Sequence, residues 1–442
     1  MMEKKKFHYA WVILIGCCLL SFIQMGLITN TNSLFIPFIL QDVGLSMTNY
    51  TAIIMVQTLL LAVGMAIAGR LFATGKIKQI LIVAGLIEGG AIFLRSQATN
   101  MTMWVIAAVM YAIGSAFLGG ALTYILLANW FQEKMGLATG IMAASTGFGG
   151  VVWNPIVGIL INNFGWRTAM MINAFIIFGV ALLLGLFVMR FAPGKNERPY
   201  GAKKDANAKD GKEASAQTLP GPSYKAVSKT LPFVLVVAVS AFMALSLAMQ
   251  QMISPQLTEN GFSVTQISFV MSALMFGTAV SQLLTGVLMD KFDHRIVITI
   301  LAILGGAGWV GVALGTSYTM IIVASVLIGC AASIMQVALA VVRRKVCGVR
   351  SYSQVSSISG AFSAILPAIG MVMAGIFFDA NRSYTMPFLI TVGLIAVSVL
   401  MIYVAYNGAY DKPGTKMNMA YLAEQKAEAE KAAESKGAEA MA

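Results

Sequence analysis

The chain has 442 residues, of which 58% are hydrophobic and 11% are charged. A soluble domain carries about 25% charged residues, so most of this chain is expected to lie in a membrane. The formal net charge of +12 does not indicate nucleic-acid binding, because the basic residues follow a membrane topology, as described below. The four cysteines show no metal-ligand spacing, so we expect reduced thiols, no metal site and no cofactor.

Twelve apolar runs are long enough to cross a bilayer, which takes about 20 residues per helix. The first run follows three lysines, but it is too long for the apolar region of a signal peptide, so we interpret it as a retained span. The pattern predicts an all-α membrane protein with twelve transmembrane helices. The runs lie near residues 10–39, 49–69, 79–97, 102–128, 136–162, 168–190, 231–257, 265–289, 296–315, 318–342, 353–378 and 385–407.

Lys and Arg residues are distributed unevenly between alternate loops. With the N-terminus in the cytoplasm, the outer loops contain only Arg95, Arg167 and Arg382, and the rest of the 30 basic residues lie on the inner side. Cytoplasmic loops of membrane proteins carry such an excess of positive charge. We therefore expect a multi-pass protein of an inner (plasma) membrane, with both termini in the cytoplasm.

The chain is expected to divide into two helical bundles that are copies of one another. The stretch between the bundles is rich in Lys, Gly, Ala, Ser and Pro, which is typical of a flexible linker. A constant shift of 217 residues relates Gly69 to Gly286, Gly158 to Gly375 and Thr168 to Thr385. The predicted parts are an N-terminal six-helix bundle at 1–191, a cytoplasmic linker at 192–230, a C-terminal six-helix bundle at 231–408 and a cytoplasmic tail at 409–442.

The loop after the eighth run carries a sequence motif that resembles the motif of a known protein family. GVLMDKFDHR resembles the signature loop of the major facilitator superfamily, G-x-L-x-D-R/K-x-G-R/K-R/K, through Gly286, Leu288, Asp290, Lys291, His294 and Arg295. The first-half copy is weaker, because Ala73 and Thr74 replace its acidic and basic residues. The resemblance implies the major facilitator fold of two six-helix repeats, with a solute site between them at mid-membrane. Gly286, Asp290, Lys291 and Arg295 would then latch the inner side shut and release it when the halves rock.

A second stretch, residues 129–170, resembles the oxalate/formate and monocarboxylate carriers. The resemblance implies a carrier of small organic acids, in which one cation usually lies in the eighth helix and one in the eleventh. The aligned residues here are Gln282 and Ser359, so a dicarboxylate would lack its fixed counter-ions. A monocarboxylate and an uncharged amphipathic solute both remain open. The likeness is carried by Trp130, Phe131, Gly136, Leu137, Ala138, Gly140, Gly147, Gly149, Gly165, Trp166 and Arg167.

Polar side chains inside the apolar runs are costly in a bilayer and mark candidate functional sites. Glu88 is the acidic residue near the middle of a run, and we interpret it either as a proton-coupling site or as a helix–helix hydrogen bond. Gln24 and Asn30 in the first run, and Gln250 and Gln251 in the seventh, lie where polar residues are expected to interrupt regular helix. These four are candidate solute contacts, with interhelical hydrogen bonding as the alternative. Further candidates are Asn154, Gln282, Gln336 and Ser359.

No nucleophile–base set, metal cluster or phosphate-binding loop appears in the sequence, so neither an enzyme nor an ATP-driven pump is expected. The sequence predicts a secondary transporter that moves a small organic solute, of the monocarboxylate type, by alternating access. The alternative is a proton-coupled exporter of uncharged or amphipathic compounds. The expected partners are the solute, the lipid bilayer and protons, with no nucleic acid, and the expected state is a monomer.

Overall fold

A computed structural model describes residues 8–72, 74–193, 197–201 and 221–426. Within these ranges the chain is helical apart from its loops and one isolated bridge, and twelve segments are long and apolar enough to span a membrane. The predicted all-α fold of twelve spans is therefore confirmed.

The spans are built from helices and short irregular segments, in chain order. Several spans are split where the backbone departs from α-helix. The helices are α1 (Tyr9–Ser21), α2 (Ile36–Val43), α3 (Met47–Phe72), α4 (Ile77–Gln97), α5 (Met101–Leu118), α6 (Gly120–Trp130), α7 (Met135–Phe164), α8 (Trp166–Leu183), α9 (Tyr224–Val227), α10 (Leu231–Met249), α11 (Ile253–Glu259), α12 (Val264–Lys291), α13 (His294–Leu314), α14 (Tyr318–Ser333), α15 (Leu339–Cys347), α16 (Tyr352–Asn381) and α17 (Thr385–Asn407).

The two halves repeat with the offset expected from the sequence. The first residues of α3, α4, α5 and α7 each precede those of α12, α13, α14 and α16 by 217 positions. The same offset relates the last residues of α4, α6 and α7 to those of α13, α15 and α16. The two halves thus repeat the same arrangement of six spans.

The first and seventh spans depart from regular α-helix, as their polar residues predicted. The first span contains a π-helical segment, η1 (Phe22–Thr29), and a 3₁₀ turn, η2 (Asn32–Phe35). The seventh span contains a 3₁₀ turn, η5 (Gln250–Met252), just before Pro255. The tenth span also carries a π-helical turn, η6 (Ile334–Ala338), between α14 and α15. Such irregular turns inside helices occur frequently at functional sites.

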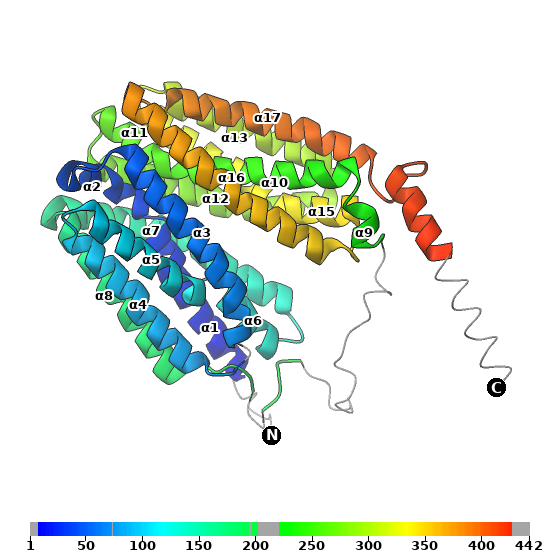
Figure 1. The fold of residues 1–442 in the computed structure, drawn as a ribbon, viewed down its shortest axis with the longest axis horizontal. Helices are drawn as coiled ribbons and strands as arrows, with labels where there is room; N and C mark the ends of the chain where they lie inside the picture. The colour runs from blue at the N-terminus through cyan, green and yellow to red at the C-terminus, as the bar shows by residue number, and fades with distance from the viewer. Residues whose placement is uncertain (1–7, 73, 194–196, 202–220, 427–442) are drawn as a thin grey trace, which may run out of the picture.

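The halves are in contact at one end of the molecule. This end, which we call the far end, holds the loops at residues 44–46, 98–100, 260–263 and 382–384. There α3 packs against α16, and α7 packs against α12 (Figure 1). A Cβ added to Gly158 would lie 2.4 Å from Ser268 Oγ, and one added to Gly375 would lie 2.5 Å from Thr51 Oγ1. Glycine at these positions allows the two halves to approach closely.

The halves separate toward the opposite end, which we call the linker end. It holds the loops at residues 131–134, 292–293 and 348–351 (Figure 1). A Cβ added to Gly136 or Gly140 on α7, Gly286 on α12 or Gly360 on α16 would meet nothing within 4 Å. The structure is therefore closed at the far end and open at the linker end.

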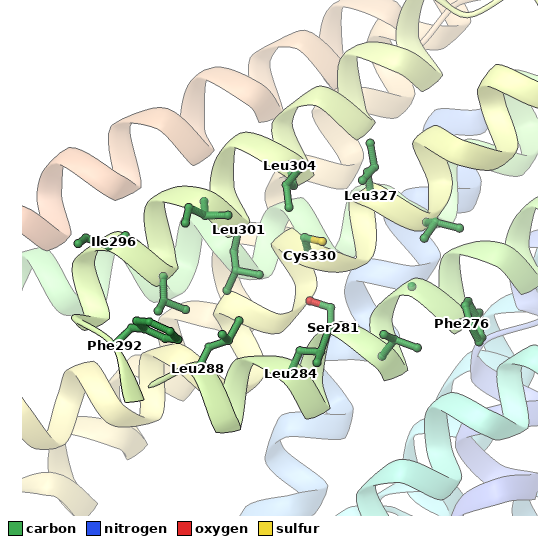
Figure 2. Close-up of a pocket in the computed structure, with 15 residues that line it drawn as sticks. Phe276, Ser281, Leu284, Leu288, Phe292, Ile296, Leu301, Leu304, Leu327 and Cys330 are labelled. Carbon is green, nitrogen blue, oxygen red and sulfur yellow. The ribbon is translucent and has the colours of Figure 1, made fainter. Parts of the chain in front are cut away.

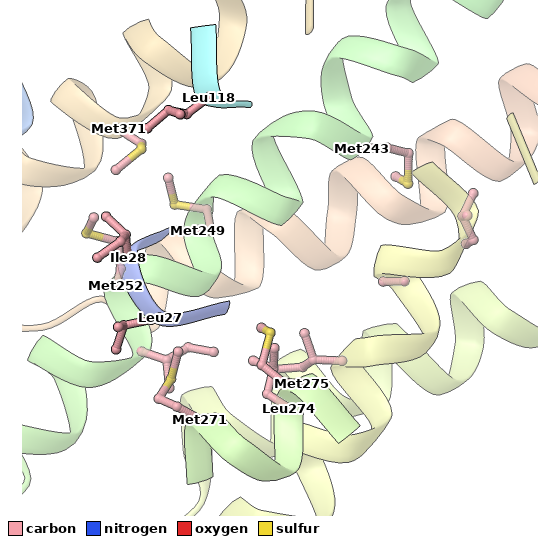
Figure 3. Packing of buried hydrophobic residues seen from close by; sticks show 14 of the residues in the cluster. Leu27, Ile28, Leu118, Met243, Met249, Met252, Met271, Leu274, Met275 and Met371 are labelled. Carbon is pink, nitrogen blue, oxygen red and sulfur yellow. The ribbon is translucent and has the colours of Figure 1, made fainter. Parts of the chain in front are cut away.

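Buried methionines gather where the halves meet. Met249, Met252 and Met371 of the C-terminal half lie around Leu27, Ile28 and Leu118 of the N-terminal half, as Figure 3 shows. Met275 on α12 fills the space beside Gly150 on α7, where an added Cβ would lie 2.6 Å from its Cγ. Methionine is flexible and fills irregular gaps between packed helices.

The described part of the tail contacts the linker end of the molecule. Glu424 accepts hydrogen bonds from the backbone N–H (2.8 Å) and the hydroxyl group of Ser223. Tyr410 and Tyr421 pack edge to face with ring centroids 5.6 Å apart. The tail thereby contacts Ser223 in the described last part of the linker.

Candidate functional site

Glu88 lies at the centre of the N-terminal half, on α4. Its side chain is 0% exposed, and neither carboxyl oxygen has a hydrogen-bond partner among the described residues. Gly114 on α5 allows α5 to lie against the Glu88 backbone, since a Cβ there would lie 2.6 Å from the Glu88 nitrogen. Gln24 and Tyr111 are among the polar side chains close enough to interact with the carboxyl group. An unpaired, charged carboxyl group costs free energy in this environment, and such buried ionisable groups mark candidate functional sites.

Arg95 is a buried cation that the sequence placed at a membrane edge. Its side chain turns into the N-terminal half and is only 4% exposed. One Nη donates to Gln57 Oε1 on α3, and the guanidinium carbon lies 4.8 Å from the ring centroid of Tyr111 and 5.3 Å from that of Trp104. These aromatic faces partly replace the hydration of the charge.

A small cavity of about 20 Å³ lies beside Arg95, with room for about one water molecule. It is enclosed by the first, third, fourth and sixth spans. The Oδ1 atom of Asn173 and the Nε atom of Arg95 are both buried without a hydrogen-bond partner among the described residues. The cavity therefore brings unsatisfied polar groups together. Its lining residues are Ile28, Asn32, Phe35, Ile92, Arg95, Tyr111, Met170 and Asn173.

The candidate contacts of the first and seventh spans lie in different surroundings. Gln24 is buried and donates through Nε2 to Ser115 Oγ at 2.8 Å. Asn30 is half-buried and donates to the Thr146 carbonyl group on α7 at 3.3 Å. Gln250 is buried, and Gln251 is half-buried with its Oε1 atom unpartnered within the described chain. Hydrogen bonds inside the N-terminal half thus occupy Gln24 and Asn30, while Gln251 retains a free acceptor.

The further candidates differ in burial: Asn154 and Ser359 are buried, whereas Gln282 and Gln336 are at least partly exposed. Asn154 is fully buried and donates to the Gly150 carbonyl group at 2.7 Å, one turn back on α7. Gln336 is exposed and Gln282 is half-buried. Ser359 is fully buried, and its hydroxyl group has no partner among the described residues.

The motif residues lie at the linker end of α12. Ser268, Ser272, Met275 and Ala279 form the face of α12 that contacts α7, and Gly286 and Asp290 continue this face. Asp290 and Lys291 are exposed, and neither makes a hydrogen bond or ion pair with another described residue. The guanidinium group of Arg295 instead lies 5.2 Å from the ring centroid of Tyr406 on α17.

A contact that the sequence did not suggest joins the halves at the far end. Asp379 on α16 accepts hydrogen bonds from the backbone N–H groups of Met47 (2.9 Å) and Thr48 (2.8 Å), and from Thr48 Oγ1 at 2.6 Å. The C-terminal half thereby caps the first turn of α3, a helix of the N-terminal half. An acidic residue near the end of the eleventh run was the available signal, but it carries no information about its partner 331 residues away.

An apolar pocket lies outside the seam between the halves. It has a volume of about 550 Å³ and lies between α12, α13 and α14, on a flank that exposes apolar side chains (Figure 2). Phe276, Leu284 and Ile300 contribute to an almost wholly apolar lining, with Ser281 and Cys330 at its base. Lipid chains cover such a surface in a membrane, so we do not place the solute there.

Comparison with known proteins decides the family. The family model described as Major Facilitator Superfamily matches residues 17–259 and 234–418, most of the chain. The chain belongs to the major facilitator superfamily. It is therefore a multi-pass membrane transporter of small solutes, and not an enzyme.

Relatives within the superfamily are distant. Monocarboxylate transporter 12 of Rattus norvegicus is 22% identical over 409 residues, covering 86% of this chain and 82% of that protein. The MFS-type transporter pynF of Aspergillus niger is 25% identical over 162 residues, which span only 37% of its length. A bacterial homologue of the human lysosomal transporter Spinster, solved in an inward-facing and unoccupied conformation, matches with a TM-score of 0.66 and 16% identity over 92% of this chain and 98% of that one. This last likeness concerns the fold alone.

Proposed function

We propose that this major facilitator protein carries a monocarboxylate across an inner membrane, together with a proton. The observation that carries the proposal is the pair of opposite charges inside the N-terminal half, Glu88 and Arg95, which make no direct hydrogen bond to each other. The likeness of residues 129–170 to monocarboxylate carriers and the relative in Rattus norvegicus support the same solute class.

The two charges are close enough to influence one another. They are seven residues apart on α4, which corresponds to about 10 Å along the helix axis. At an effective dielectric constant of about 20, two unit charges at this distance interact by roughly 2 kcal/mol. Protonation of Glu88 therefore leaves the half with an uncompensated positive charge, which favours entry of an anion. Binding of a proton and of a carboxylate would be linked in this way.

We propose that the solute crosses the membrane by alternating access, in which the two halves rock so that the site opens to one side at a time. We infer that the linker end faces the cytoplasm, because the basic loops lie there, and that the structure is the inward-open state. Asp290 lies on the face of α12 that would approach α7 when the linker end closes. In that state its carboxylate would lie near the first turn of α7, where a negative charge is favourable. We assign Gly286, Asp290 and Lys291 to the inner latch, which is released in this structure. The guanidinium group of Arg295 packs instead against Tyr406 on α17.

The solute path would follow the seam between the halves. Gln251, Gln282 and Gln336 are only partly buried or exposed and can contact a solute directly. Gln24, Asn154 and Gln250 are buried, and the half-buried Asn30 is hydrogen-bonded to α7, so these four would act by positioning their neighbours. A monomer suffices for this mechanism, since both halves belong to one chain.

A second candidate function is proton-coupled export of amphipathic compounds. It is favoured by the methionine cluster where the halves meet, because a soft apolar lining accommodates varied apolar groups. In this case Glu88 would retain its coupling role, but the solute would need no fixed cation.

Uptake into proteoliposomes separates the two functions. Labelled lactate, formate, oxalate and an amphipathic cation are each offered with and without an imposed pH gradient. We expect gradient-dependent uptake of lactate or formate and none of oxalate. Transport of the amphipathic cation with no uptake of either monocarboxylate would instead establish the second function.

A further inference from the structure

The C-terminal half contains a cation that no acidic side chain among the described residues neutralises. Arg343 lies on α15 and is half-buried, and its Nη2 atom donates to Ser240 Oγ on α10 at 2.9 Å. Its Nε atom is buried and has no hydrogen-bond partner within the described residues. The ionisable groups that act on it are Tyr352 and Cys347, and in the described chain no carboxylate pairs with it. This guanidinium group is therefore available to an anion.

Hydroxyl groups without partners line the neighbouring face of α16. Ser356, Ser359 and Ser363 follow Tyr352 at intervals of three or four residues, so the four side chains share one face of the helix. The three serine oxygens are buried and make no hydrogen bond to any described residue, and Ser359 is fully buried. Pro367, on the same face, has no N–H to offer to the Ser363 carbonyl group. The face thus presents several unused hydrogen-bonding groups.

The guanidinium group and the serine face lie at similar depths. Helix α10 packs against both α15 and α16. Ser240 is nine residues from the start of α10, about 14 Å from the linker end, and Ser359 is seven residues from the start of α16, about 11 Å from that end. The hydrogen bond to Ser240 therefore holds the charge of Arg343 at about the level of Ser359.

We propose that Arg343 and the serine face of α16 bind the carboxylate of the transported solute, an inference that rests on the proposed monocarboxylate function. A half-buried guanidinium group without a carboxylate partner is stabilised by an anion, and its planar fork of donors matches the two oxygens of a carboxylate. The serine hydroxyl groups can donate to the remaining lone pairs or to a hydroxyl group of the solute. In this proposal the cation absent from positions 282 and 359 is supplied by the tenth span, at about the level of Ser359. The adjacent π-helical turn η6 gives the backbone there a local irregularity of the kind found at functional sites.

The test compares four variants with the unaltered transporter. Arg343→Gln removes the charge, Arg343→Lys keeps the charge without the fork, and Ser359→Ala removes one donor. Arg344→Gln is the matched control, because Arg344 is the next residue and is exposed. Two readouts are taken: the KM for labelled lactate in proteoliposomes, and the rise in melting temperature that lactate causes in detergent.

We expect Arg343→Gln to raise the KM at least tenfold and to abolish the thermal stabilisation by lactate. Arg343→Lys should fall between this variant and the unaltered protein, and Ser359→Ala should raise the KM about threefold. Arg344→Gln should match the unaltered protein in both readouts. Size-exclusion profiles and unliganded melting temperatures establish that each variant is folded.

An unchanged KM and an unchanged lactate stabilisation in Arg343→Gln would overturn the site while leaving monocarboxylate transport intact. If lactate stabilises the unaltered protein in an Arg343-dependent way, but no uptake occurs, the site stands and the transport proposal fails. Absence of both stabilisation and uptake for lactate, formate and acetate would overturn both.

Discussion

Arg95 and Arg343 each lie near the end of an apolar run, where charged side chains usually reach for water. Both instead turn toward the interior of their half, Arg95 onto Gln57, Trp104 and Tyr111, and Arg343 onto Ser240. Spacing along one helix cannot reveal this, because the direction of a long side chain is decided by what neighbouring helices present to it. The sequence did identify Glu88, since a carboxyl group in the middle of an apolar run is costly in any packing.

Replacement of Arg95 tests its electrostatic role. Arg95→Gln removes the positive charge that acts on Glu88, so we expect uptake driven by a pH gradient to fall at least tenfold. Arg95→Lys preserves the charge and should retain a substantial part of the activity. Initial rates in proteoliposomes measure both, and equal rates for Arg95→Gln and the unaltered protein would remove Arg95 from the mechanism.

At the scale of helices, α3 and α12 each begin at a serine cap, but α3 has a second cap from the opposite half. The first turn of α12 is capped by Ser263, which forms a capping box with Gln266. The first turn of α3 has the equivalent cap, since Ser46 Oγ accepts a hydrogen bond from the Asn49 N–H at 3.1 Å. It is capped in addition by Asp379 of the opposite half, and this second cap exists only while the far end is closed. Closure of the far end is thereby linked to the hydrogen bonds that the Asp379 carboxylate accepts from the first turn of α3.

Asp379→Asn should weaken far-end closure. An acidic cap is worth about 1 kcal/mol, which corresponds to a roughly fivefold shift in a two-state equilibrium. Spin labels at the exposed positions Asn49 and Asn381 should show a larger population with separated far ends. Ser263→Ala is the control, because it removes a cap within one half and should leave the distance distribution as it is. A distribution unaffected by Asp379→Asn would contradict the linkage.

Asp290→Ala tests the opposite end. We expect slower transport and a smaller population closed at the linker end, because the carboxylate would no longer stabilise the first turn of α7. Asp293→Ala is the matched control, since Asp293 is also exposed but caps α13 of its own half through the Arg295 N–H at 2.8 Å. Transport rates and linker-end accessibility like those of the unaltered protein would exclude Asp290 from the latch.

For the whole molecule, the sequence predicted the twelve spans and their repeat because both depend on local patterns, the length of apolar runs and a constant shift. The offset of 217 residues holds at the starts of α3, α4, α5 and α7. The polar interruptions of the first and seventh spans were also foreseen, at Asn30 and Gln250. Which end is closed could not be predicted, because it depends on contacts such as Asp379 with Thr48 between residues far apart in the chain. Under the proposed alternating access, the same sequence would also adopt the opposite state.

Proton-linked transport of a monocarboxylate is tested most directly by Glu88→Gln, which holds this position permanently neutral. Lactate transport is measured in the same proteoliposomes in two ways, as uptake driven by a pH gradient and as exchange of internal for external lactate at equal pH. We predict that the variant keeps exchange and loses the acceleration by the gradient. Gradient-driven uptake at the unaltered rate in Glu88→Gln would contradict the account.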